Sequence, residues 1–192
     1  MSRKLMQKKT VTKSLIRSAF ITLLRKKDIE DITVQEIVEE AMVSRSAFYL
    51  HYRDKYDLYE TIAADLLNEL FTLMKQADLF PLDILLHDNY DQNRPLNITL
   101  QFLEYIHANA DIYTVFIHQK DFQIRFAKAL SNILYTGNAL PRIITNHIAY
   151  GSIGTIMEWL AKETPYSVHY VAKLLSSLTV CEILEYKNLR IE

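Results

Sequence analysis

The sequence is poor in the residues that interrupt or cross-link a chain. Its 192 residues include one cysteine, three glycines and four prolines. All-β proteins need many turns, and turns use glycine and proline, so this scarcity disfavours an all-β fold. The single cysteine, Cys181, has no partner for an internal disulfide and no Cys or His at metal-site spacing. We therefore expect a buried core thiol there, with no metal and no cofactor.

Long apolar runs are also missing. No stretch approaches the roughly 18 to 20 unbroken apolar residues that span a bilayer, and the basic start MSRKLMQKKT is followed by no apolar signal-peptide segment. Hydrophobic residues nevertheless make up 49% of the chain, enough for a substantial core. The expectation is a folded cytoplasmic protein that does not enter a membrane.

Acidic residues are absent from the start of the chain. Residues 1–27 contain nine lysines and arginines and no Asp or Glu, although the whole chain has a formal net charge of −1. A basic N-terminal module on an acidic body is typical of a protein that docks one end on a phosphate backbone. Charge alone leaves a second interpretation open, a basic solvated tail on an ordinary protein.

Helical periodicity runs through most of the sequence. Apolar residues recur at spacings of three and four, and leucine, alanine, lysine and glutamate favour helices. We predict an all-α fold of about nine helices, with a loop over 78–95 that has room for one short helix. The expected helices cover 12–27, 34–41, 45–52, 54–77, 96–108, 111–120, 121–136, 141–162 and 167–188.

The first three of these helices have the layout of a helix-turn-helix. Thr33 and Glu36 form a capping-box signature at the start of the second helix, and Ser44 is an N-cap for the third. A long helix followed by two short ones joined by a tight turn makes a three-helix DNA-binding unit, whose last helix enters the major groove. Phe48 and Tyr52 are assigned to the core of this unit.

The run ITVQEIVEEAMVSRSAFYLHYRDKYDL, residues 32–58, resembles the DNA-binding signature of the TetR/AcrR family of regulators. Met42 stands where the family usually has a glycine, and Ala47 where it commonly has Thr or Ser. The resemblance implies a helix-turn-helix domain at 1–56 and a helical domain at 57–192 that dimerises and senses a ligand.

The recognition helix carries the candidates for base contacts. Arg45 follows Ser44 at the N-terminal end of that helix, where a guanidinium can bind guanine bidentately, and Ser46 is a short donor beside it. Gln35 can bind adenine or brace Arg45, and for both residues a phosphate contact or a solvated side chain stays an alternative. Thr33 and Ser44 add donors at helix N-termini. The family resemblance implies phosphate contacts for Tyr49, His51 and Lys55.

Two further sets of residues lie in the second domain. A two-fold operator requires a dimer, and the resemblance implies that the last two helices pair with their symmetry mates. The interface candidates are Gly151, Gly154, Val171, Leu175, Leu178 and Glu182; the alternative is that the final helix only covers the monomer core. Candidates for an effector pocket are Phe102, Tyr105, His107, Tyr113, Phe116 and Trp159, which can equally be core fillers.

The function that follows is sequence-specific DNA binding. We predict a dimeric transcriptional regulator, a repressor as is most frequent in the family, that binds a palindromic operator and is modulated by a small molecule. A co-regulator that acts through protein contacts is the alternative. The sequence contains no G-x-S-x-G, phosphate-binding glycine loop or H-E-x-x-H motif, so an enzyme is not expected.

Overall fold

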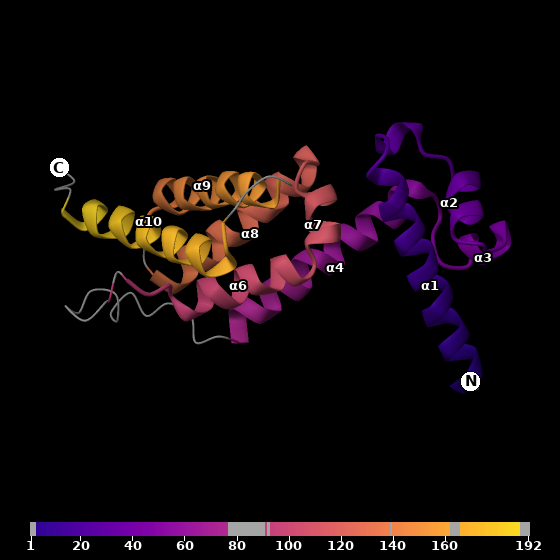
Figure 1. The fold of residues 1–192 in the computed structure, drawn as a ribbon, viewed down its shortest axis with the longest axis horizontal. Coiled ribbons are helices and arrows are strands. Elements are labelled where there is room, and N and C mark those ends of the chain that lie inside the picture. Colours follow the sequence, from indigo (N-terminus) through magenta and orange to yellow (C-terminus); the bar gives the residue numbers. More distant parts are fainter. Residues whose placement is uncertain (1–2, 77–90, 92, 139, 162–165, 189–192) are drawn as a thin grey trace. The chain divides into compact units, whose positions relative to one another are not determined.

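The computed structural model describes residues 3–76, 91, 93–138, 140–161 and 166–188. Within them the chain forms nine α-helices and one 3-10 turn and contains no strand, which confirms the predicted all-α fold (Figure 1). The predicted loop at 78–95 lies outside the described residues, apart from 91 and 93–95. The elements are α1 (Arg3–Leu24), η1 (Ile29–Asp31), α2 (Val34–Glu40), α3 (Arg45–Tyr49), α4 (Lys55–Gln76), α6 (Asn97–Ala108), α7 (Ala110–Phe116), α8 (Lys120–Asn138), α9 (Arg142–Leu160) and α10 (Val168–Asn188).

The chain divides into two compact units, Met1–Leu66 and Leu67–Glu192. The division falls inside α4, ten residues beyond the predicted domain boundary at residue 56, and α4 contributes to both units. No helix in the described part of the chain has the length and apolar character to cross a bilayer.

The N-terminal unit packs α1, α2, α3 and the first part of α4 around a small apolar core. Phe20, Ile37, Phe48 and Leu58, one from each helix, are fully buried, and Tyr52 is only 5% exposed, so the assignment of Phe48 and Tyr52 to this core is confirmed. Helix α1 begins at Arg3, nine residues before the predicted start. Apolar periodicity marks only the packed part of a helix, whereas Lys, Arg, Gln and Met also extend helices on propensity alone.

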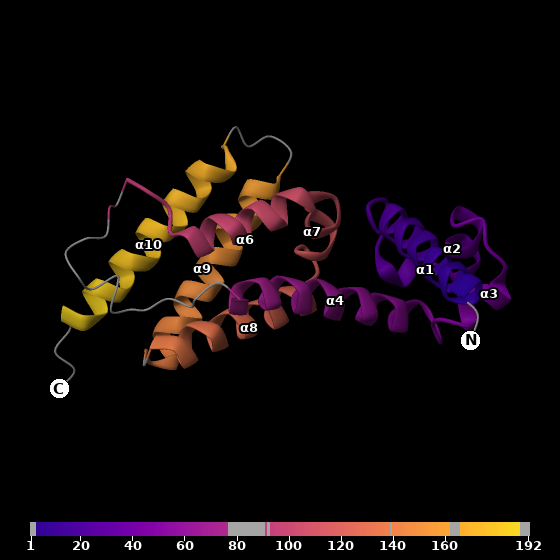
Figure 2. The same ribbon diagram turned by 90° about the horizontal axis from the view of Figure 1, so that it is seen from below.

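The C-terminal unit is built from pairs of adjacent helices. Helix α8 lies beside α9, and α6 lies beside α10 (Figure 2). Phe116, Phe122 and Phe126 are fully buried and stack edge to face along the core. The hydroxyls of Ser131 and Thr145, both buried, meet at 2.9 Å and join α8 to α9.

The expectation of a buried thiol at Cys181 is wrong, because this residue is exposed on α10. Its neighbours explain the exposure. Val180 and Ile183 are each 1% exposed and define the inner face of the helix. Successive helical residues are about 100° apart, so the residue directly after Val180 turns away from the core.

Candidate DNA-binding interface

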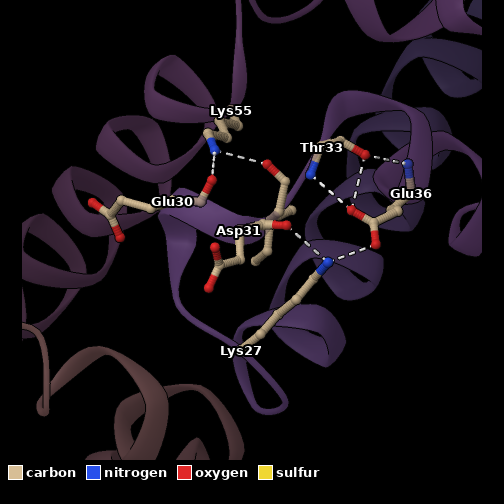
Figure 3. Close-up of polar contacts among 7 residues, drawn as sticks. Lys27, Glu30, Asp31, Thr33, Glu36 and Lys55 are labelled. Atoms are coloured by element: carbon tan, nitrogen blue, oxygen red, sulfur yellow. Dashed lines mark hydrogen bonds and ion pairs between the residues drawn. The ribbon is translucent and has the colours of Figure 1, made fainter.

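The start of α2 is fixed by the predicted capping box. The Thr33 hydroxyl accepts the N–H of Glu36 at 3.2 Å, and the Glu36 carboxylate accepts the N–H of Thr33 at 2.9 Å (Figure 3). The Lys27 ammonium donates to the other oxygen of the same carboxylate at 2.5 Å. This lysine and then the Thr33 N–H lower the pKa of Glu36 to about 2. Thr33 itself is exposed at this helix terminus.

The turn between α2 and α3 is made without glycine. Met42 has a φ of 52°, the left-handed conformation that glycine normally supplies at a helix C-terminus. The N–H of Met42 donates to the Glu39 carbonyl at 3.1 Å and that of Val43 to the Val38 carbonyl at 3.0 Å. These two bonds are the Schellman motif, which satisfies the last carbonyls of α2. The turn therefore has standard geometry with an unfavourable residue in it.

Helix α3 begins at the predicted cap and exposes polar side chains. The Ser44 hydroxyl accepts the N–H of Ala47 at 3.1 Å, and Ser44, Arg45 and Ser46 are exposed. The Arg45 guanidinium lies 5.8 Å from the Tyr49 ring centroid and 3.5 Å from the phenol oxygen, long for a hydrogen bond. Tyr49, one helical turn further on, is 48% exposed and supports the guanidinium without covering it.

The remaining predicted contacts have partners within the protein. The Gln35 amide donates to Glu39 at 2.6 Å, one turn along α2. His51 is half-buried beside Tyr52, with ring centroids 6.2 Å apart. The Lys55 ammonium donates to the carbonyl oxygens of Glu30 at 2.6 Å and Ile32 at 2.8 Å (Figure 3). The structure thus brings Ser44, Arg45, Ser46 and Tyr49 together and gives Gln35 and Lys55 partners inside the protein.

Two exposed apolar residues near α3 were missed by sequence reasoning. Met42 is 93% exposed and Leu50 is 77% exposed, on either side of the recognition helix. Apolar side chains at a DNA surface can contact the methyl group of thymine. The available signal was positional. Met42 lies just after α2 and Leu50 just after α3. An apolar residue at the end of a short helix, outside its buried face, does not reach the small core.

The six pocket candidates of the C-terminal unit have different surroundings. Tyr113 and Phe116 are fully buried core residues. The Tyr105 hydroxyl donates to Glu69 at 2.6 Å. His107 is exposed and stacks on Trp159, with ring centroids 5.5 Å apart.

Phe102 alone among the six candidates lines the apolar cavity of this unit, which has a volume of about 40 Å³. Helices α4, α6, α8, α9 and α10 all contribute to its lining. The lining residues are Met74, Ile98, Thr99, Phe102, Leu130, Leu134, Ile148, Ser152, Leu175 and Thr179.

The interface candidates divide between a surface and the interior. Gly151 and Gly154 are exposed on α9, with open space where a Cβ would lie, and they line a groove between α9 and α10. Leu178 is 46% exposed, whereas Val171 and Leu175 are buried within the unit.

Glu182 is half-buried on α10. Its carboxylate oxygen Oε1 lies 3.6 Å from Nε2 of His147 on α9. Exposed apolar side chains that sequence reasoning did not select continue the surface of α9 and α10. They are Ile143, Tyr150, Tyr166, Tyr170 and Leu174.

Comparison with known families agrees with this geometry. Residues 16–62 match the family described as bacterial regulatory proteins of the tetR family, and residues 93–180 match a transcriptional regulator C-terminal region. The first match covers the capped helix-turn-helix, and the second covers most of the helical C-terminal unit. The chain belongs to the TetR family.

Individual relatives are more distant. An uncharacterized HTH-type transcriptional regulator of Bacillus subtilis, YxbF, is 29% identical over an alignment of 166 residues, and the match covers 82% of this chain and 42% of the relative. The chain therefore spans less than half the length of that curated relative.

Solved structures share the fold. A TetR transcriptional regulator of Streptococcus agalactiae aligns over 92% of this chain and 99% of its own, with a TM-score of 0.63 and 23% identity. NalD of Pseudomonas aeruginosa aligns over 91% and 97%, with a TM-score of 0.64 and 16% identity. These likenesses concern the fold.

Proposed function

We propose that the protein binds a palindromic operator as a homodimer and represses transcription, and that a small uncharged molecule modulates this binding. The observation that carries the proposal is the exposed face of α3, where Ser44 caps the helix and Arg45 is supported by Tyr49. Bidentate arginine contacts to guanine are the commonest specific contacts in the major groove. One α3 helix reaches only a few base pairs, so specificity in a genome requires two.

The surface of α9 and α10 supports the proposed dimer. Tyr150, Tyr170, Leu174 and Leu178 are 39–51% exposed although they are large and apolar. Contiguous exposed apolar side chains mark interaction sites in soluble proteins. The open space above Gly151 and Gly154 would allow a helix of the second copy to approach closely. A two-fold interface of this kind matches the symmetry of a palindromic operator.

The cavity of the C-terminal unit is the proposed effector site. Its lining combines apolar side chains with three hydroxyls from three helices, those of Thr99, Ser152 and Thr179, and no charged residue. A charged ligand would lose its hydration there without gaining an ion pair, so the effector is inferred to be uncharged and able to form a hydrogen bond. A single water needs roughly 10–15 Å³ of such space, so a larger ligand must separate the lining helices.

Regulation requires that the effector bind two states of the protein with different affinities. A state with separated helices would bind the effector more tightly than a state with closed helices. Helix α4 contributes Met74 to the cavity and begins at Lys55 in the DNA-binding unit. We infer that a displacement of α4 carries the signal. Repression is inferred because a dimer bound at a promoter blocks access to it. NalD, which has the same fold, is described as a secondary repressor of the MexAB-OprM multidrug efflux pump.

The operator is found by selection of random duplexes with the full chain, followed by titration of the enriched sequence at several salt concentrations. We expect enriched palindromes. The logarithm of the association constant should fall linearly with log[salt], and each neutralised phosphate should contribute about 0.9 to the slope. Failure to enrich any sequence would refute specific DNA binding. In vitro transcription from a promoter containing the operator tests repression, and increased transcription would refute it.

The effector class is tested with three six-carbon probes, 1-hexanol, hexanoate and hexylammonium, in thermal unfolding of the full chain. Only the alcohol is expected to raise the melting temperature saturably, and Thr179→Val, which removes one hydroxyl at nearly constant volume, should weaken that response. A larger response to either charged probe would contradict the uncharged class and would leave the DNA-binding proposal intact.

A further inference from the structure

Two lysines from different parts of the N-terminal unit bind the backbone that leads into α2. Lys27 follows α1, and its ammonium donates to the Asp31 carbonyl at 2.9 Å as well as to Glu36. Lys55, the first residue of α4, donates to the carbonyls on either side, those of Glu30 and Ile32 (Figure 3). Three consecutive carbonyl oxygens thus face two ammonium groups, an arrangement that we call the lysine clasp.

The clasp fills a gap in the backbone hydrogen bonding. In η1 the carbonyls of Asp28 and Ile29 accept the N–H groups of Asp31 and Ile32, and the Thr33 carbonyl accepts the N–H of Ile37 in α2. The three carbonyls between these, at residues 30–32, have the lysines as donors. Backbone carbonyls that no helix or turn pairs must find other donors, and bonds from a charged donor are roughly twice as strong as neutral ones.

The surroundings of Lys55 are unfavourable for a DNA phosphate. Glu30 and Asp31, whose carbonyls belong to the clasp, are acidic and exposed. Their carboxylates repel a phosphate that approaches the same turn, whereas they favour the two ammonium groups. Two of the three N–H donors of Lys55 are already engaged with carbonyls.

We propose that Lys55 and Lys27 are positioning residues for operator recognition, and that Lys55 acts through the clasp and not through a phosphate contact. The inference rests on the DNA binding proposed above. The clasp fixes the chain immediately before Thr33, the N-cap of α2, and α2 in turn supports the Schellman turn into α3. Loss of an ammonium lets the start of α2 shift, which misplaces Arg45 relative to the base edges.

The test compares Lys55→Met and Lys27→Met with wild type on the selected operator and on a scrambled duplex of the same length, over a range of salt. Methionine keeps the apolar stem and removes the ammonium. We expect operator affinity to fall at least about 10-fold in both variants, scrambled-duplex affinity to stay within about 2-fold, and the salt slope to stay unchanged. Lys128→Met, an exposed lysine of α8 in the C-terminal unit, is the charge-matched control and should resemble wild type.

Other outcomes overturn the proposal. If Lys55 contacts a phosphate, Lys55→Met should lose equal affinity for the operator and for the scrambled duplex, and its slope of log K against log[salt] should be smaller by about 0.9. A purely stabilising role predicts a lower melting temperature with wild-type operator affinity in the folded range. If Lys55→Met does not fold, Lys27→Met decides by the same criteria. Wild type is measured first, so absence of operator binding there refutes the proposed function and is distinct from a failure of the clasp.

Discussion

The two units expose different side chains at the surfaces proposed to function. Around α3, hydroxyls, a guanidinium and a phenol are exposed together with the apolar Met42 and Leu50, whereas the large side chains exposed on α9 and α10 are mainly tyrosines and leucines. Base edges and phosphates are recognised by hydrogen-bond donors, and a second copy of a helical surface is recognised by apolar contact. The contrast supports the proposal that the N-terminal unit binds DNA and the C-terminal unit binds a second copy of the chain.

The units also differ in how their functional residues are held. Thr33, Ser44 and Lys55 are fixed by hydrogen bonds to named backbone atoms, so their positions tolerate little change. The cavity of the C-terminal unit is bounded mainly by apolar side chains, which can repack when a ligand enters. This difference supports the proposal that the hydrogen-bonded residues of the N-terminal unit bind DNA and that the cavity of the C-terminal unit adapts to an effector.

The largest expected effect separates dimerisation from folding. Gly154→Arg places a long cation in the open space on α9, where a Cβ meets nothing within 4 Å. We expect an intact fold, a monomer in sedimentation equilibrium and an operator affinity lower by about 100-fold or more, because avidity between two half-sites is lost. Gly154→Ala is the matched control and should remain dimeric. A dimeric Gly154→Arg with wild-type affinity would exclude this surface as the interface.

The next effect concerns base recognition in the N-terminal unit. Arg45→Ala removes the guanidinium that Tyr49 supports, and its loss should cost about 1–3 kcal/mol of operator affinity and relax preference at one base pair. Binding to operators substituted at each position measures this preference. Arg94→Ala, which removes an exposed arginine of the C-terminal unit, is the matched control and should bind as wild type does. Uniform weakening on every substituted operator would assign Arg45 to a phosphate instead.

A smaller effect, of opposite sign, is expected in the turn between α2 and α3. Met42→Gly should raise the free energy of unfolding by about 1 kcal/mol, because a side chain in the left-handed conformation is strained and glycine is not. Met42→Ala should change little, since the Met42 side chain is 93% exposed and alanine retains the Cβ. Urea unfolding of both variants measures the difference, and equal stabilities would show that the turn carries no strain.

The smallest effect is on the acid sensitivity of the N-terminal unit. The pKa of Glu36 is lowered from 4.5 to about 2, so its contribution to stability is complete above its ordinary pKa and is lost as the pH falls through about 2. Glu36→Gln keeps an acceptor in the capping box and should flatten the stability profile between about pH 5 and pH 2. Asp57, whose pKa is also lowered by the Arg53 N–H, leaves some acid sensitivity in the variant. Identical acid unfolding curves would contradict this assignment.

Sequence reasoning succeeded where the structure depends on near neighbours. The capping box joins Thr33 to a residue three positions away, and the Ser44 cap likewise acts on Ala47. Such contacts follow from local geometry, so residue types and spacing are enough to predict them. The same holds for Phe48, whose helical spacing assigns it to the core.

The DNA-binding motif was thus determined by the sequence itself, because its caps and its core pattern lie within a few turns of helix. Only the tertiary structure decided the partners of Lys55, which are 25 and 23 residues away at Glu30 and Ile32. It also decided the cavity, to which five helices contribute, and the exposure of Cys181. These features depend on how distant helices pack, and hydrophobic periodicity identifies the buried face of a helix without identifying its neighbour.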